Sequence, residues 1–287
     1  MIGAVIGDFI GSYYEVNNSK RKDNPLVVYT KNNKIINRFT DDSVMTVAVA
    51  DVVSKYLEND NMSQDDMIKI IQKYGREYIN AGYGGMFLTW LISAAPKPYN
   101  SFGNGALMRV SPVALCYKLS LTEKHGLAKQ VTEITHNHPS ALKSVECYVN
   151  IINHLMYSRS DSKEAINDYC RSEFKCYYNS ELCELDKLRP SYEFDVTCDG
   201  TLPVAIEAFI EANSYMETIQ NAISMGGDSD TIAAIAGAIA EAYYGSKKVL
   251  EEARSTKVGK RSIEDCLIEV DPKFAEKAYE FDIALVR

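Results

Sequence analysis

The sequence lacks several features that would define other classes of protein. Its 287 residues hold no run of about 18 apolar residues, the length a membrane-spanning helix needs. The N-terminus has no basic flank and small-residue cleavage site of the signal-peptide type. Seven cysteines form an odd number without a CxxC pair, so neither a disulfide framework nor a thiolate zinc site is predicted. These absences predict a soluble cytoplasmic protein with no membrane partner.

Basic residues are neither abundant nor clustered. The formal net charge is −8 and Lys and Arg are dispersed, which argues against non-specific nucleic-acid binding. No segment is dominated by Ser, Gly, Pro or one sign of charge, so no interdomain linker is visible. Because 46% of the residues are hydrophobic, the chain can bury a sizeable core. We therefore expect a single domain over residues 1–287.

Hydrophobic periodicity predicts helices along most of the chain. Gly3, Gly7 and Gly11 lie on one face of a helix over residues 1–14, which predicts close packing against another helix. Pro203 is expected in the first turn of a helix, and Ser214 with Glu217 forms a capping-box pair. Residues 158–201 are polar and weakly periodic and give no clear element. The other expected helices span residues 44–57, 64–78, 106–119, 126–135, 140–156 and 232–244.

Strand signals are sparse. Residues 26–29 and 34–39 have short β-prone character, and Asn32 and Asn33 between them suit a turn. The sequence predicts an all-α fold with at most this small peripheral hairpin.

Two short acidic clusters each precede a strongly apolar helix: Thr40-Asp41-Asp42 and Asp228-Ser229-Asp230-Thr231. Either cluster alone is an ordinary helix cap, but each has one carboxylate more than a cap requires. Four carboxylates beside hydrophobic helices are costly unless a cation neutralises them. An oxygen-only ligand set favours Mg²⁺ or Mn²⁺ over zinc, and four carboxylates overcharge a single Mg²⁺. The clusters therefore predict a site for two Mg²⁺ ions, with Mn²⁺ as a substitute.

Two further motifs are chemically suggestive. Ser101-Phe102-Gly103-Asn104-Gly105 is a glycine-rich turn opening a helix, where free amides suit a pyrophosphate, although an ordinary turn has the same composition. His136 and His138 have a spacing that can bind metal, but no Cys or carboxylate lies near them in the sequence. We do not assign them to a catalytic metal.

Six motifs, in order along the chain, resemble those of the ADP-ribosylglycohydrolase family, which includes dinitrogenase-reductase-activating glycohydrolases and eukaryotic ADP-ribosylhydrolases. The resemblance implies a compact fold of orthogonal helices and a binuclear Mg²⁺ site. It also implies hydrolysis of the bond between the anomeric carbon of ADP-ribose and its acceptor. The motifs lie at residues 3–15, 39–43, 82–87, 101–109, 135–139 and 226–232.

The resemblance also implies roles for individual residues. Glu15 and Asp41 are the expected catalytic carboxylates, while Asp8 and Arg109 match family positions that orient other groups. For His136, a purely structural role is an equal alternative to a substrate contact. The expected metal ligands are Thr40, Asp41, Asp42, Asp228, Asp230 and Thr231, and the expected substrate contacts are Tyr83, Gly84, Ser101, Phe102, Gly103, Asn104, Gly105 and His136.

The expected substrate is an ADP-ribosylated protein or an ADP-ribose-containing small molecule. The sequence does not name the acceptor, which could be arginine, serine, another side chain, a nucleic-acid base or a free ADP-ribose ester. It does not reveal the oligomeric state either. Two other functions fit the same clusters. A two-metal nucleotide phosphohydrolase would release phosphate, and a non-catalytic ADP-ribose-binding protein would bind without turnover.

Overall fold

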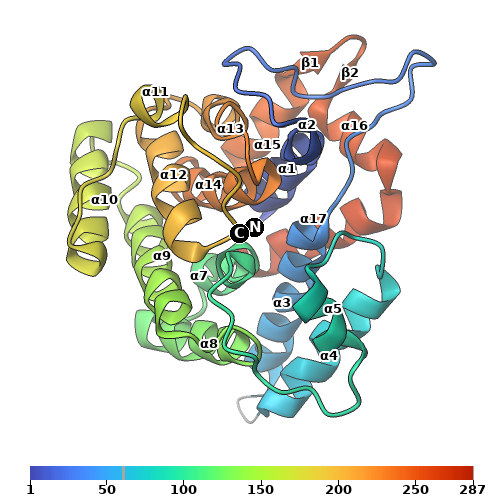
Figure 1. Ribbon diagram of the computed structural model, residues 1–287, viewed down its shortest axis with the longest axis vertical. Coiled ribbons are helices and arrows are strands. Elements are labelled where there is room, and N and C mark those ends of the chain that lie inside the picture. The colour runs from blue at the N-terminus through green and yellow to red at the C-terminus, as the bar shows by residue number, and fades with distance from the viewer. Residues whose placement is uncertain (60–61, 287) are drawn as a thin grey trace.

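Helices make up most of the structure, and two of them lie at its centre. The computed structural model describes residues 1–59 and 62–286, and Figure 1 shows their arrangement. The central helices are α1 (Ile2–Gly11) and α14 (Ser229–Tyr244). Within the described residues, the paired strands are limited to β1 (Lys257–Val258) and β2 (Arg261–Ser262). The all-α prediction is confirmed.

The remaining helices pack around this pair. Helix α14 contacts α1, α9, α12 and α13, and every residue from Ser229 to Ala242 is buried. In the part of the chain that is described, no helix has both the length and the apolarity to span a bilayer. The surrounding helices are α2 (Tyr14–Asn17), α3 (Asp41–Glu58), α4 (Gln64–Glu77), α5 (Gly85–Ile92), α6 (Gly105–Met108), α7 (Ser111–Leu115), α8 (Leu121–Glu133), α9 (Pro139–Tyr157), α10 (Lys163–Tyr178), α11 (Leu185–Leu188), α12 (Cys198–Ile210), α13 (Tyr215–Ile223), α15 (Ser246–Ser255), α16 (Ile263–Val270) and α17 (Pro272–Val286).

The glycine face of α1 packs directly on α14. A Cβ atom at Gly7 would lie 2.2 Å from the carbonyl oxygen of Ala233, and one at Gly11 would lie 2.5 Å from the Cα atom of Asp230. Such distances are shorter than van der Waals contact, so any side chain there would force the helices apart. The predicted close packing is confirmed, and it fixes the start of α14 beside the end of α1.

The helix predicted over residues 106–119 is two short helices, α6 and α7. Pro112 is the reason, because its nitrogen has no hydrogen to donate to the carbonyl of Met108. That carbonyl accepts a hydrogen bond from the Thr46 hydroxyl of α3 instead, at 3.0 Å. The break lets the chain turn directly after Arg109.

The prediction that Pro203 lies in the first turn of its helix is wrong. Helix α12 begins at Cys198, because the Thr197 side chain accepts a hydrogen bond from the Gly200 amide at 3.0 Å and caps it earlier. The unassigned segment 158–201 also contains α10, whose cap is Ser162. Its first turn follows a polar loop, and its three buried side chains give only a narrow apolar stripe.

The hairpin expected over residues 26–39 is reduced to one bridge. Tyr29 and Ile35 pair antiparallel, and Asn33 adopts a positive φ of 60° in the turn between them. The hairpin of paired strands lies near the C-terminal end instead, where Gly259 has a φ of 67°. The segment over residues 26–39 is tied to α1, because the Asn37 side chain donates to the carbonyls of Phe9 (3.0 Å) and Ile10 (3.1 Å).

Candidate active site

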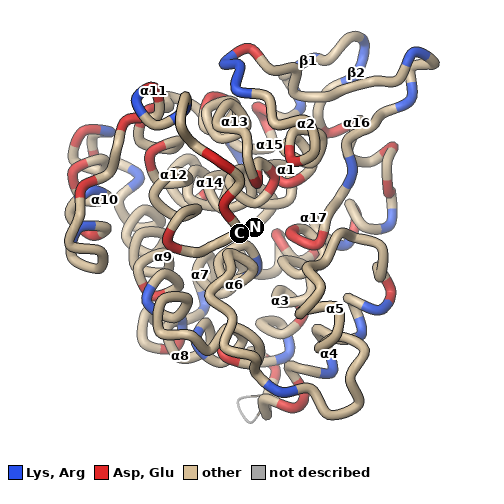
Figure 2. The backbone as a smooth tube through the Cα atoms, viewed as in Figure 1, with Lys and Arg blue, Asp and Glu red and all other residues tan. Residues whose placement is uncertain are grey.

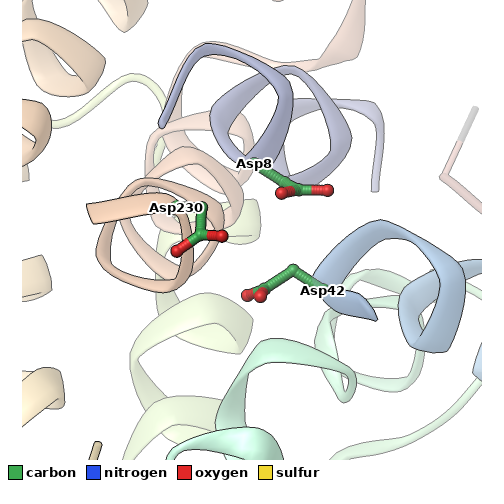
Figure 3. Close-up of side chains that lie close together, drawn as sticks. All are labelled: Asp8, Asp42 and Asp230. Carbon is green, nitrogen blue, oxygen red and sulfur yellow. The ribbon is translucent and has the colours of Figure 1, made fainter. Parts of the chain in front are cut away.

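The first turns of α3 and α14 bring the two predicted acidic clusters together. Asp42 is the second residue of α3 and Asp230 the second residue of α14, and Asp8 on α1 completes a group of three buried carboxylates. One oxygen from each of the three lies within 4.8 Å of the others, and Figure 3 shows the side chains converging. Two loops almost 190 residues apart in sequence therefore meet through the contact of helices α1, α3 and α14.

A second group of carboxylates shares Asp230 with the first. Glu15 on α2 and Asp228 at the cap of α14 each place an oxygen within 4.8 Å of Asp230 and of one another. Glu15 is partly exposed, whereas Asp228 is buried. Figure 2 shows acidic segments meeting near the middle of the view. The two groups form one continuous acidic centre.

Asp8 holds the first cluster in place. Its Oδ2 atom accepts hydrogen bonds from the amides of Thr40 (2.9 Å) and Ser43 (3.1 Å), and its Oδ1 atom accepts from the Thr40 hydroxyl (2.7 Å). Thr40 in turn caps α3 by accepting from the Asp42 amide. Asp8 thus links α1 to the start of α3.

Other hydrogen bonds orient the remaining acids. The Thr231 hydroxyl donates to Asp42 Oδ2 at 3.1 Å, which joins α14 to α3. The Asn104 side chain donates to Asp228 Oδ2 at 2.6 Å and to the Thr201 hydroxyl at 3.0 Å. Asn104 was predicted to contact substrate, and the structure also makes it a support for Asp228.

The acidic centre has no cation of its own. Among the described residues, no Lys, Arg or His forms an ion pair with any of these carboxylates. The Asp42 Oδ1 atom is buried without a hydrogen-bond partner. Because an unpaired buried carboxylate oxygen is costly, this centre is suited to a bound cation, and its oxygen-only donors suit a hard one.

The pKa values follow from this arrangement. Burial, followed by the charge of nearby carboxylates, raises the pKa of Asp41 to about 7 and that of Asp42 and Asp230 well above the usual value. Burial is also the largest cause of the raised pKa of Asp228 and Glu15. A bound cation would reverse these shifts by favouring the ionised form.

A cavity of about 420 Å³ opens above the acidic centre. Asp41, the first residue of α3, lines this cavity beside Gly82. Of the predicted metal ligands, Thr40 lies behind the wall, whereas the others line the cavity. Of the predicted substrate contacts, those in the wall are Gly84, Ser101, Gly103, Asn104, Gly105 and His136.

Tyr83 and Phe102 lie outside the wall of the cavity. The Tyr83 ring packs against Phe87 with centroids 5.3 Å apart, and its hydroxyl is buried without a partner. Phe102 is half-exposed and meets the edge of the His138 ring, at 5.5 Å between centroids. Their predicted contact with substrate is not visible in this arrangement.

The glycine-rich turn has fewer free amides than its sequence suggests. The Gly103 amide donates to the Ser101 hydroxyl at 3.2 Å, and the Asn104 amide donates to the Val196 carbonyl at 2.7 Å. In the described turn, the amides of Ser101, Phe102 and Gly105 are left without such a bond. Two of the five amides are therefore already occupied, and three are not.

Several cavity residues were missed by sequence reasoning. Phe194 and Val196 are half-exposed and reach the wall because residues 102–104 pair with residues 196–198 through backbone hydrogen bonds. No local pattern signals a pairing between segments more than 90 residues apart. The other wall residues outside the predicted contacts and ligands are Gly82, Gly85, Met86, Phe87, Tyr99, Met108 and Arg109.

An acidic, helix-capped centre below a cleft is the arrangement that the six motifs predicted, and a family comparison agrees. The profile of the ADP-ribosylglycohydrolase family matches residues 1–280, so the chain belongs to this family. The predicted reaction class is confirmed with it: the protein is an enzyme that hydrolyses the glycosidic bond to ADP-ribose.

Individual relatives are distant but cover most of the chain. ADP-ribosylhydrolase ARH3 of Homo sapiens is 24% identical over 317 aligned positions, spanning 88% of this chain and 86% of the relative. ADP-ribosylarginine hydrolase Tri1 of Pseudomonas putida (strain GB-1) is 23% identical over 272 positions, spanning 85% and 69%. A solved structure titled ADP-ribosylglycohydrolase-related protein complex superimposes with a TM-score of 0.67 at 22% identity, covering 98% of this chain and 94% of that one. This likeness supports the fold.

Proposed function

We propose that the protein is a Mg²⁺-dependent hydrolase that releases ADP-ribose from a modified protein side chain. The observation that carries this proposal is the buried acidic centre, which has no internal cation and forms the floor of a cleft large enough for a nucleotide. The names of two relatives, an ADP-ribosylhydrolase and an ADP-ribosylarginine hydrolase, support the substrate class.

The ligands that would hold the metal are the oxygen donors of the two acidic loops. Asp230 belongs to both groups of carboxylates, which favours two ions sharing it over a single ion. Thr40 gives its hydroxyl hydrogen to Asp8 and accepts from the Asp42 amide, which leaves one lone pair of its oxygen for a cation. When bound, Mg²⁺ would polarise a water molecule and hold ribose hydroxyls, and Mn²⁺ could replace it. The proposed ligands are Thr40, Asp41, Asp42, Asp228, Asp230 and Thr231.

Two carboxylates at the mouth of the acidic centre, Glu15 and Asp41, are candidates to accept the proton of the attacking water. Glu15 is partly exposed, lines the cleft and has a raised pKa, so it suits a base that accepts a proton from the attacking water. Asp41 has a pKa raised to about 7 in the absence of metal and is the second candidate. As positive charge grows on the sugar in the transition state, the remaining acids would stabilise it.

The test is to incubate the protein with arginine-linked and serine-linked ADP-ribosyl peptides, with Mg²⁺ or with EDTA, and to measure free ADP-ribose. We expect Mg²⁺-dependent release from one of the two peptides, which also identifies the acceptor. Release of inorganic phosphate instead would support a phosphohydrolase. Binding of ADP-ribose without release from either peptide would contradict the proposal for protein acceptors.

We also propose a single domain over residues 1–287, a cytoplasmic location, and an ADP-ribosylated protein or an ADP-ribose-containing small molecule as the substrate. The seven cysteines are all free thiols in the structure, five of them buried, which is compatible with a reducing compartment.

A further inference from the structure

A buried arginine, Arg109, lines the inner wall of the cleft. Arg109 follows α6 and is fully buried, and no acidic side chain in the described residues pairs with it. Its Nε and Nη1 atoms have no hydrogen-bond partner, and the Phe87 ring lies 5.9 Å from the guanidinium carbon. Because a buried cation without a counter-ion costs stability, its position calls for a role other than stabilising the fold.

The polar contacts of Arg109 lead to His136. Its Nη2 atom donates to the Thr135 hydroxyl at 2.5 Å and lies 3.2 Å from His136 Nδ1, and the Thr135 hydroxyl lies 2.7 Å from the same Nδ1. A guanidinium can only donate hydrogen bonds. The Thr135 oxygen therefore accepts from Arg109, and its own hydrogen has two acceptors in reach, His136 Nδ1 at 2.7 Å and the Thr132 carbonyl at 3.5 Å. The shorter contact favours Nδ1 as the acceptor, which places the hydrogen of the neutral ring on Nε2.

The Nε2 atom of His136 is directed toward the cleft. His136 lines the cavity, and Nε2 has no hydrogen-bond partner within residues 1–59 and 62–286. A Cβ at Gly105 would lie 3.1 Å from Nε2 and one at Gly103 would lie 3.6 Å from it, so the absence of those side chains keeps this edge of the ring open.

The surroundings of His136 keep it neutral. The charged and titratable groups that face the ring are Arg109 and Tyr99, whose ring centroid is 6.0 Å away. Burial, and then the charge of Arg109, hold the pKa of His136 well below its usual value. Burial lowers the pKa of Arg109 to about 10, so the guanidinium stays protonated at neutral pH.

We propose that Arg109 is a positioning residue that acts through Thr135. It fixes His136 as the neutral tautomer with hydrogen on Nε2, so that this N–H donates to an acceptor oxygen of the bound ADP-ribosyl group. The inference rests on the proposed function for the identity of the ligand. The tautomer itself is a property of the protein alone and is tested without ligand.

The first experiment measures the tautomer. In protein labelled with ¹⁵N-histidine, which has four histidines, a long-range ¹H–¹⁵N spectrum distinguishes the two ring nitrogens, and His136→Gln assigns the signal. We expect hydrogen on Nε2 and no titration between about pH 5 and 8. Hydrogen on Nδ1, or a doubly protonated ring within that range, would overturn the inference.

A matched pair of variants at Thr135 tests the relay. Thr135→Val has nearly the same shape without the hydroxyl, whereas Thr135→Ser keeps the hydroxyl. We expect Thr135→Val to give a mixture of His136 tautomers and Thr135→Ser to keep the wild-type tautomer. Equal spectra for the two variants would show that the Thr135 hydroxyl does not determine the tautomer. Thermal unfolding of both variants checks that they are folded. Both variants keep the buried Arg109 side chain, which Arg109→Gln would remove.

ADP-ribose binding, measured by calorimetry with Mg²⁺, tests the consequence for the ligand. Thr135→Val should weaken binding by about three- to tenfold, the size of one hydrogen bond. In a His136→Leu background the same change should have no further effect. An equal loss in both backgrounds would mean that Thr135 only supports the fold. If the wild type failed to bind ADP-ribose, the proposed function and the donor role would both fall, although the measured tautomer would stand.

Discussion

Two buried acidic clusters lie along the same pair of helices, and only one of them has its own cation. At the far end of α1 and α14, the α-ammonium group of Met1 lies 2.8 Å from Glu241 and 2.9 Å from Asp282, all fully buried. At the other end, Asp8, Asp42 and Asp230 meet without any such partner in the described chain. The same helix packing thus contains one ion cluster that is complete and one that is open.

The pKa values of the carboxyl groups differ between the two clusters. Burial raises the pKa of Asp282, but the nearby ammonium and hydrogen bonds outweigh it, and the net pKa is lowered. Glu241 keeps a pKa raised to about 7, since burial dominates there. In the open cluster every carboxyl has a raised pKa. Burial alone therefore does not distinguish the two clusters; the fixed counter-ion does.

The largest expected effect is in the open cluster. Asp230→Asn removes the carboxylate shared by both groups, so Mg²⁺-dependent release of ADP-ribose should fall on the order of 1000-fold, equivalent to several kcal/mol. Steady-state release from an ADP-ribosyl peptide measures it, with Asp23→Asn at an exposed ion pair as the matched control. Wild-type turnover in Asp230→Asn would show that the open cluster is not the catalytic centre.

A substitution in the complete cluster should lower the stability of the fold instead. Asp282→Ala leaves the buried ammonium with a single carboxylate, and the free energy of unfolding should decrease by about 3 kcal/mol. Urea unfolding in EDTA measures this, with Asp23→Ala as the control. Mg²⁺ affinity of the folded variant should be unchanged. A variant as stable as the wild type would mean that the ammonium pairs contribute nothing net.

A smaller effect is expected from the support of the open cluster. Asn104→Leu removes the donor to Asp228 and should weaken Mg²⁺ binding by about 10- to 100-fold, as for other residues that orient metal ligands. Titration calorimetry with MgCl₂ measures the affinity, and Asn32→Leu on the exposed turn is the control. Unchanged affinity would place Asp228 outside the metal ligands.

The smallest effect is the pH dependence of the metal-free protein. The folded pKa of Asp41 is about 7 against an ordinary value of 3.8, so its contribution to stability is present below about pH 4 and lost as pH rises through about 7. In EDTA the free energy of unfolding should fall by about 1–2 kcal/mol over that range, allowing for screening of this partly exposed group. Excess Mg²⁺ should remove the decline. A flat profile in EDTA would contradict the open cluster.

The open cluster could be predicted from the sequence because each acidic loop directly precedes a strongly apolar helix. The helix boundary and the excess carboxylate are both local signals, and so is the glycine face of α1. The family resemblance implied that Asp8 orients other groups. Its three hydrogen bonds to Thr40 and Ser43 could not be predicted, because they depend on how α1 packs against α3.

The cleft wall was harder to predict for a physical reason. Phe194 and Val196 reach it through backbone bonds to a turn far away in sequence, and no periodicity records such a pairing. The relay from Arg109 to His136 joins residues 27 apart through tertiary packing. Pro203 was wrongly placed in the first turn because the stronger start signal is the Thr197 cap, almost two turns earlier.

The glycine face of α1 has a consequence for how such an enzyme can diversify. Because α1 and α14 touch through their main chains, the spacing between Asp8 and Asp230 is set by backbone atoms and not by side-chain volume. The segments 82–87 and 189–197 are carried by other parts of the chain and can vary without changing this spacing. Because this backbone contact fixes the geometry of the acidic centre, the residues at the mouth of the cleft can change while that geometry is kept.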